Sequence, residues 1–164
     1  MQRSNGTLLW LSGALALGLF VAMAIHSSPL TPAIPALQLT FNEAAFRAIL
    51  TQWGPDGVAL FRQHFCIDFP VLASYGLFGY LFARHSSLFD RLAPLPRRLS
   101  GGLLPTAAGL DTIENLLHLR FIADPATHTP ALYLIAGLVA SGKWLLIAAF
   151  ALCSGYLLLT RSRH

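Results

Sequence analysis

The chain has 164 residues, the length of one ordinary domain. Hydrophobic residues make up 55% and charged residues only 11%, and the apolar residues come in long runs, which excludes an ordinary soluble domain and is typical of a membrane protein. The net charge of +4 comes from arginines at the ends of these runs rather than along one soluble face, so we expect a lipid bilayer and no nucleic acid as partner.

Residues 7–25 form the first apolar run, which is long enough to cross a bilayer. The alternative is a secretory signal, because Ala22-Met-Ala24 is similar to a small-x-small cleavage site. Since the run is longer than the usual signal core, we favour a retained first span.

A linker and a short helix are expected next. Residues 26–39 hold three prolines, which predicts an extended linker. Thr40-x-x-Glu43 then reads as a capping box that opens an amphipathic helix at about 41–53. This external helix either lies at the membrane interface, with Trp53 at headgroup depth, or caps the bundle; we favour the cap.

Three further spans are predicted at about 66–84, 101–121 and 131–160. The second follows an N-cap at Asp56, and Pro70 should bend it. Residues 85–100 are expected to be a basic loop broken by prolines, with Ser100 capping the third span. A polar turn at 120–129 leads to the fourth. The fold class is therefore all-α: a single membrane domain over 1–164, built as a four-helix bundle.

The arginines predict the orientation of these spans. One side carries seven of them (Arg3, Arg84, Arg91, Arg97, Arg98, Arg161 and Arg163), whereas the other carries three (Arg47, Arg62 and Arg120). Because cytoplasmic loops are rich in Lys and Arg, we expect both termini in the cytoplasm and the protein in a cell inner membrane.

A polar stripe interrupts the third span. Asp111, Glu114, Asn115 and His118 recur at spacings that place all four on one helical face. An ionisable group at the bilayer centre costs roughly 2.5–3.5 kcal/mol on insertion scales, so the stripe should face protein, water or a ligand rather than lipid.

Depth, at about 1.5 Å per residue, sorts the polar groups of the spans into two layers. The middle layer holds Tyr75, Asp111 and Lys143, and the outer layer holds His64, Asp68, Glu114, Asn115 and His118. If these faces meet, they outline an intramembrane polar pocket that opens outward. Asp111 and Lys143 could equally be a buried pair that holds the third and fourth spans in register, or handle a proton or an anionic headgroup.

The outer layer also suggests a metal site. His64-x-x-x-Asp68 and Glu114-x-x-x-His118 are i,i+4 pairs, the spacing at which one helix can offer two ligands to an ion, and this donor set suits zinc or iron. The alternative is a hydrogen-bonded network with interfacial water. No other pattern in the sequence indicates a cofactor.

Asp68-Phe-Pro70 with Tyr75, then Pro105 and Asp111-x-x-Glu-Asn115, resembles a pattern in small bacterial membrane proteins of four spans. Trp53-Gly-Pro-Asp-Gly57 is similar as well. The resemblance implies a four-span bundle and bacterial origin, and it implies no catalytic role.

Three classes of function stay open on this reading. The first is a protein that binds or transfers a lipid-like or small polar ligand, held by Asp68, Tyr75, Asp111, Glu114, Asn115, His118 and Lys143. The second is an accessory subunit of a larger membrane complex or a homo-oligomer. The third is an intramembrane enzyme that uses the carboxylates as acid and base, with or without a metal. Small size and the lack of a strong catalytic motif favour the first two.

Overall fold

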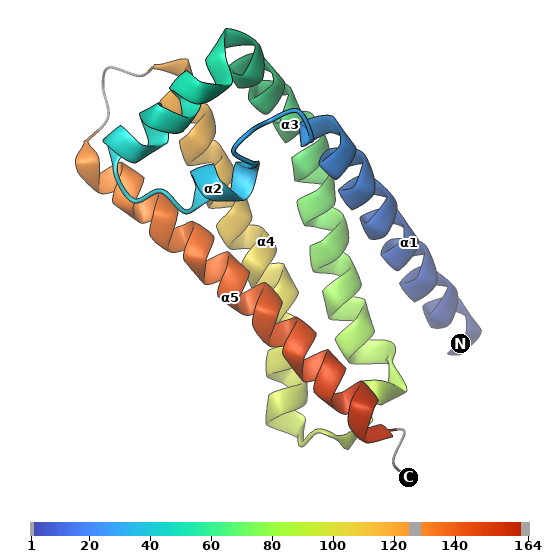
Figure 1. Cartoon of the computed structure of the whole chain (residues 1–164). Helices are drawn as coiled ribbons and strands as arrows, with labels where there is room; N and C mark the ends of the chain where they lie inside the picture. The colour runs from blue at the N-terminus through green and yellow to red at the C-terminus, as the bar shows by residue number, and fades with distance from the viewer. Residues whose placement is uncertain (1, 125–128, 162–164) are drawn as a thin grey trace.

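The computed structural model describes residues 2–124 and 129–161, and this part of the chain is all-α (Figure 1). Part of the predicted turn at 120–129 and the basic residue Arg163 lie outside the described residues. The helices pack as a bundle, as the sequence predicts. Their bounds are α1 Gln2–Ser27, α2 Ile34–Gln38, α3 Glu43–His85, the 3-10 helix η1 Ser87–Arg91, α4 Pro94–Ala123 and α5 Pro130–Arg161.

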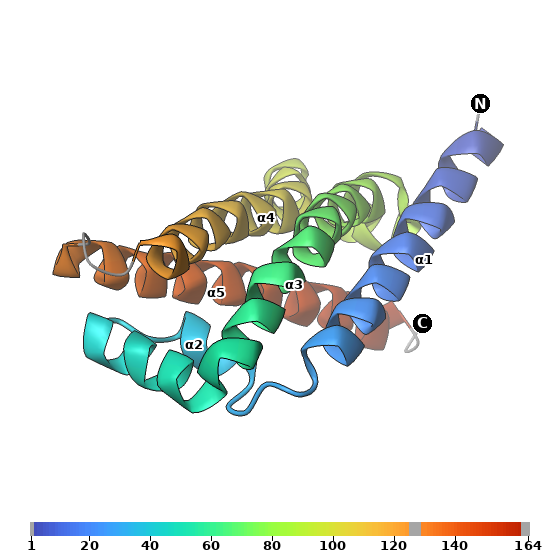
Figure 2. The same cartoon turned by 90° about the horizontal axis from the view of Figure 1, so that it is seen from above.

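The long helices pack in chain order: α1 on α3, α3 on α4, and α4 on α5. Seen from above, α1 stands at one side of α3 and α4 lies on the other (Figure 2). The starts of α1 and α4 and the end of α5 lie at the same end of the bundle, which we call the termini end (Figure 1). Residues 43–53 of α3 lie across the opposite end, which we call the cap end.

The linker between α1 and α3 is partly helical, which corrects the prediction of an extended segment over 26–39. α1 continues to Ser27, and α2 then forms a short turn of helix that has Pro35 in its first turn. Proline is tolerated at that position because the first N–H groups of a helix have no partner within the helix.

The external helix and the second span form one element, α3, with a break at Gly54. This residue has φ 66°, a left-handed conformation that glycine adopts without strain, and the helix resumes at Pro55. Asp56 therefore lies inside the helix and is not the N-cap that we predicted. At the start of α3, Asn42 is the N-cap, since its side chain accepts a 2.8 Å hydrogen bond from the Ala45 amide. The predicted capping box is wrong, because the Thr40 hydroxyl instead donates backwards to the Leu37 carbonyl.

Residues 43–53 cap the bundle. Phe46 and Trp53 are buried in an apolar core that also holds Leu37, Phe61 and Phe121. The Trp53 indole N–H donates to the Pro32 carbonyl at 2.8 Å, so this side chain joins the linker to α3. The cap reading of the external helix is thus the one that the structure supports.

α4 begins six residues before the predicted cap at Ser100, because Pro94 and Pro96 occupy its first turn instead of breaking a loop. Ser100 lies inside the helix, and its hydroxyl donates to the Pro96 carbonyl. Further along, α3 and α4 approach closely: a Cβ built on Gly79 would lie 2.5 Å from the Cβ of Leu104. The absence of a side chain at Gly79 permits this contact.

Within residues 2–124 and 129–161, three helices are long and apolar enough to cross a membrane: Gly6–Ser27, Glu43–His85 and Pro130–Thr160. α4 is not among them, because its polar stripe lowers its hydropathy, and the predicted third span at 101–121 stays a prediction. α4 nevertheless packs between α3 and α5. The three apolar helices imply contact with a lipid bilayer.

Two apolar cores lie at opposite ends of the bundle. The cap-end core includes Phe65 on α3, Phe121 on α4 and Tyr133 on α5. The termini-end core includes Leu104 on α4 and Phe150 on α5. Between these positions, α3, α4 and α5 each carry buried polar residues, so the fold places one polar layer between two apolar ones.

Candidate functional site: a buried polar cluster

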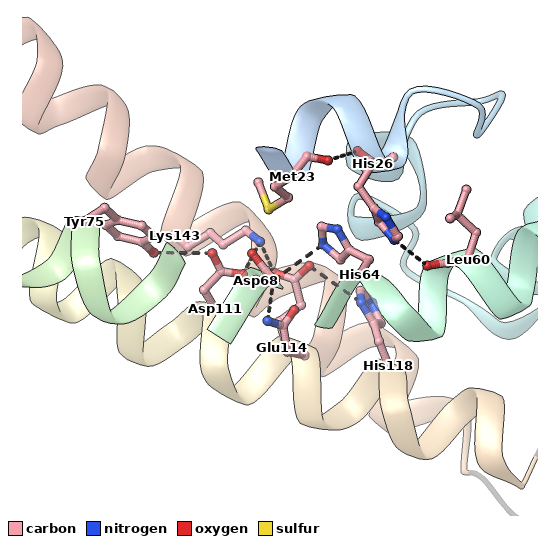
Figure 3. A network of polar contacts seen from close by, with 12 residues as sticks. Met23, His26, Leu60, His64, Asp68, Tyr75, Asp111, Glu114, His118 and Lys143 are labelled. Atoms are coloured by element: carbon pink, nitrogen blue, oxygen red, sulfur yellow. Dashed lines mark hydrogen bonds and ion pairs between the residues drawn. The ribbon is translucent and has the colours of Figure 1, made fainter. Parts of the chain in front are cut away.

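The polar stripe of α4 is fully inside the bundle. Asp111, Glu114, Asn115 and His118 are all buried, and Glu114 is 0% exposed. Their spacing of three and four residues places them on one face, and that face is turned toward α3 and α5. Together with His64, Asp68 and Tyr75 of α3 and Lys143 of α5, they form what we call the polar cluster (Figure 3).

Lys143 is the centre of this cluster. Its side chain is 2% exposed, and its Nζ lies 2.5 Å from Asp111 Oδ1 and 2.7 Å from Glu114 Oε2. One ammonium therefore joins two carboxylates that stand one turn apart on α4, and it ties α5 to α4 (Figure 3). Because all three groups are withdrawn from water, these contacts are little weakened by solvent.

α3 contributes through Asp68, which faces the stripe. The Asn115 side-chain amide donates to Asp68 Oδ2 at 2.5 Å. His64 lies one turn earlier on α3, with its Nε2 3.6 Å from the same oxygen. The Nδ1 atom of His64 is buried and has no hydrogen-bond partner among the described residues. Asp68 thus joins α3 to α4, and His64 keeps one unsatisfied nitrogen.

Tyr75 closes the cluster on the side of the termini end. Its hydroxyl donates to Asp111 Oδ2 at 3.3 Å, while the other oxygen of Asp111 contacts Lys143. The middle layer predicted from depth, Tyr75, Asp111 and Lys143, is therefore brought together by direct contacts. The outer-layer residue Glu114 also belongs with Lys143, so the two predicted layers form one continuous cluster.

His118 closes the cluster on the side of the cap end. Its Nδ1 lies 3.8 Å from Glu114 Oε1. Rings surround it: the Phe46 centroid is 5.4 Å away and the Phe61 centroid 6.0 Å away. We call the rings on this side the aromatic layer: Phe46, Phe61, Phe121 and Tyr133. The layer separates the polar cluster from the cap end.

The sequence analysis did not assign the aromatic layer to the site. A usable signal was present, because Phe121 follows His118 by three residues and therefore lies on the same face of α4. Phe46 comes from residues 43–53 of α3, which we call the cap helix, and the packing of this helix over α4 depends on tertiary structure that the sequence pattern does not show.

The formal charges of the cluster do not balance. Asp68, Asp111 and Glu114 carry three negative charges when ionised, whereas Lys143 carries one positive charge. With both imidazoles neutral, the net charge is −2. Withdrawing uncompensated charge from water costs several kcal/mol per ion even after relaxation. The cluster therefore needs about two further positive charges, from protons or from a cation.

Neither of two cavities in the structure is lined by a residue of the polar cluster. One, of about 670 Å³, lies at the cap end, and its lining includes Phe46, Phe121 and Tyr133. We call it the cap-end cavity, and three rings of the aromatic layer stand between it and His118. The other, of about 500 Å³, lies at the termini end. The outward-opening polar pocket that the sequence predicts therefore stays a prediction.

Two observations weigh against the metal hypothesis. Its four residues do lie in the cluster, but the described residues contain no group of three or more His, Cys, Asp and Glu side chains placed to hold a metal ion. Glu114, which the hypothesis needs as a ligand, is already in contact with the Lys143 ammonium. The donor set is present, and its arrangement in this structure suits an ion-pair network better than a tetrahedral metal site.

Comparison of the chain with protein-family models, with curated proteins and with solved structures yields no match. The fold and composition therefore define the class: an all-α bundle with three apolar helices able to span a membrane in its described part, and a charged cluster enclosed between α3, α4 and α5.

Proposed function

We propose that this multi-pass membrane protein binds a small polar ligand of positive charge in the polar cluster, the proton being the smallest such ligand. The observation that carries the proposal is the excess of carboxylates over Lys143 in an interior that water does not reach. A ligand with two positive charges, or a singly charged ligand together with one proton, would balance the cluster. A lipid-like ligand is less well supported, since neither the cap-end cavity nor the cavity at the termini end is lined by a residue of the polar cluster.

Unsatisfied polar atoms support the same proposal. His64 Nδ1 and both oxygens of Glu114 are buried without a well-oriented hydrogen bond to another described residue, although Lys143 and His118 contact Glu114 as ions. Buried polar groups in native proteins nearly always have partners, so such atoms mark a place where further hydrogen bonds can form. They lie on α3 and α4, on the side of the cluster nearest the cap end.

The cap-end cavity is the proposed access route. It borders Phe46, and Phe46 borders His118. Phe46 belongs to the cap helix, which Gly54 separates from the rest of α3. A movement of the cap helix about this glycine would carry Phe46 away from His118 and join the cavity to the cluster. In the orientation that the arginines favour, the cap end faces outward, so the ligand would come from outside the cytoplasm.

Native mass spectrometry of protein extracted gently from its own membrane tests this proposal. We expect an added mass on the wild type, and its loss in Glu114→Gln. The matched control is Asp56→Asn, which removes an exposed carboxylate outside the cluster and should retain the ligand. Adding back the identified compound at 100 times its Kd should raise the free energy of unfolding of the wild type by about 2.7 kcal/mol.

A proton alone adds too little mass for this measurement, so infrared spectroscopy covers that case. Protonated carboxyl groups absorb separately from carboxylates, and Glu114→Gln should remove one such band. Wild-type protein with neither an added mass nor a protonated carboxyl band would refute the proposal.

An accessory subunit is the second candidate, and α1 favours it. α1 packs mainly on α3, and its remaining surface carries exposed large side chains that include Leu8, Leu11, Leu15 and Phe20. That surface suits either lipid or a helix of another membrane protein. Mass spectra that show the chain only in complex with other polypeptides, with no ligand dependent on Glu114, would favour this candidate.

A further inference from the structure

A second candidate site surrounds the cavity of about 500 Å³ at the termini end, between the end of α3 and the start of α4. Three arginines line it: Arg84 from α3, and Arg97 and Arg98 from α4. None of them belongs to the polar cluster. The cavity stands where the candidate span of α3 ends, at His85, and thus at the depth of lipid headgroups.

Positive charges outnumber negative charges around this cavity. Arg97 is held in place, because its Nη2 lies 2.8 Å from Asp90 Oδ1 and 3.1 Å from the Arg84 carbonyl. Arg84 and Arg98 form no ion pair with another described residue, and both are exposed. Three guanidinium groups therefore face one carboxylate, which leaves about two positive charges available to an anion. Guanidinium binds phosphate with paired hydrogen bonds, so phosphate is the chemistry that this set fits.

The rest of the cavity and its surroundings are apolar. Ala83 and Leu92 contribute to the lining, and Tyr80 lies one turn before Arg84. Leading away from the cavity toward the middle of the bundle, the exposed face of α3 continues through Leu77. A soluble anion would leave this apolar face uncovered, whereas the acyl chains of a lipid would cover it.

We propose that this cavity binds the phosphate headgroup of an anionic phospholipid, with the acyl chains along the exposed face of α3. Arg97, which Asp90 orients, and the unpaired Arg84 and Arg98 bind the headgroup. Tyr80 lies at the boundary between headgroup and chains, where its ring is apolar and its hydroxyl is polar. Basic pockets between membrane helices on the cytoplasmic side are a recurrent mode of headgroup binding. This inference is independent of the polar cluster and of its ligand.

The test is lipid titration of the full-length protein in detergent, followed by native mass spectrometry. The probes are phosphatidylglycerol, phosphatidylcholine and inorganic phosphate. We expect the wild type to prefer phosphatidylglycerol over phosphatidylcholine. Replacing both Arg84 and Arg98 with Gln should weaken phosphatidylglycerol binding about 30-fold, since each arginine near the surface contributes about 1 kcal/mol and about 1.4 kcal/mol is tenfold.

Two further double variants make this test specific. Arg62→Gln with Arg91→Gln removes the same total charge outside the cavity and should leave the preference intact. Arg84→Lys with Arg98→Lys keeps the charge but loses the paired hydrogen bonds of guanidinium, so it should bind phosphatidylglycerol more tightly than the Gln double variant and less tightly than the wild type. Equal binding by the Gln double variant and the wild type would overturn the proposal. Inorganic phosphate that displaces the lipid and binds alone as tightly would assign the site to a soluble anion instead.

Discussion

Lys143 of α5 and Asp111 of α4 form a 2.5 Å ion pair in the interior of the bundle. The same ammonium also contacts Glu114, and both carboxylates stand on the side of α4 that faces away from lipid. Lys143 is the only lysine of the chain. Two of the three carboxylates of the cluster thus share one ammonium. Loss of the ammonium should therefore destabilise the protein more than loss of one of the carboxylates.

Lys143→Met should destabilise the protein strongly. Loss of the ammonium leaves Asp111 and Glu114 uncompensated, and removing one partner of a buried pair typically costs roughly 3–5 kcal/mol. Glu114→Gln should cost much less, because Lys143 keeps Asp111 as its partner. The midpoint of thermal unfolding in detergent measures both.

The double variant Lys143→Met with Glu114→Gln is the control for this asymmetry. It removes one charge of each sign, so it should be more stable than Lys143→Met alone. Equal destabilisation by Lys143→Met and Glu114→Gln would show that the excess negative charge does not govern the stability of the cluster.

Gly79→Ala should separate α3 from α4. A Cβ at this position would lie 2.5 Å from the Cβ and the Cδ1 of Leu104 and 2.8 Å from its Cγ, so the helices must shift. Overpacking of this kind costs about 1–3 kcal/mol. The matched control is Gly102→Ala on α4, where a new Cβ meets nothing within 4 Å and the better helix propensity of alanine should stabilise by about 0.5–1 kcal/mol. Unfolding midpoints of opposite sign relative to wild type are the expected result.

The polar stripe was predictable from the sequence because helical periodicity alone fixes which residues of one helix share a face. Asp111, Glu114, Asn115 and His118 needed no knowledge of the other helices. Depth along the spans then placed Lys143 opposite Asp111. The hydrogen bond between Asn115 and Asp68 could not be predicted in this way, because it depends on the rotation of α3 about its axis.

Prolines caused the errors in the helix boundaries. Pro35, Pro94 and Pro96 were interpreted as breakers, yet each lies in the first turn of a helix, where proline loses no intrahelical hydrogen bond. The same prolines are compatible with a loop and with the first turn of a helix, so the sequence alone does not distinguish the two. The capping box failed for a related reason, since Thr40 and Asn42 are both good caps and only the path of the backbone selects Asn42.

Both termini should lie on the same side of the membrane. The three apolar helices alone would place them on opposite sides, but the structure brings the start of α1 and the end of α5 to the same end, which is what we expect if α4 crosses as well (Figure 1). Reporter fusions at each terminus, one active only in the cytoplasm and one only outside it, measure this. We expect the cytoplasmic reporter to be active at both ends. Activity on opposite sides would refute the four-span arrangement.

Phe46→Leu should expose His118 to reagents from the cap end. Phe46, like Phe121, both lines the cap-end cavity and contacts His118, so a smaller side chain there thins the aromatic layer on the side of the cavity. The measurement is modification of His118 by diethyl pyrocarbonate, followed peptide by peptide in mass spectra. We expect a several-fold faster reaction than in the wild type.

Phe61→Leu is the matched control, because Phe61 also lies beside His118 but does not line the cavity. Both variants remove a similar amount of buried ring, so a general loosening of the cap-end core would speed the reaction equally in the two. Acceleration in Phe46→Leu alone identifies the cap-end cavity as the route to the cluster. Equal rates in both variants would show that the cap-end cavity is not the access route, and that the ligand reaches the cluster by another path.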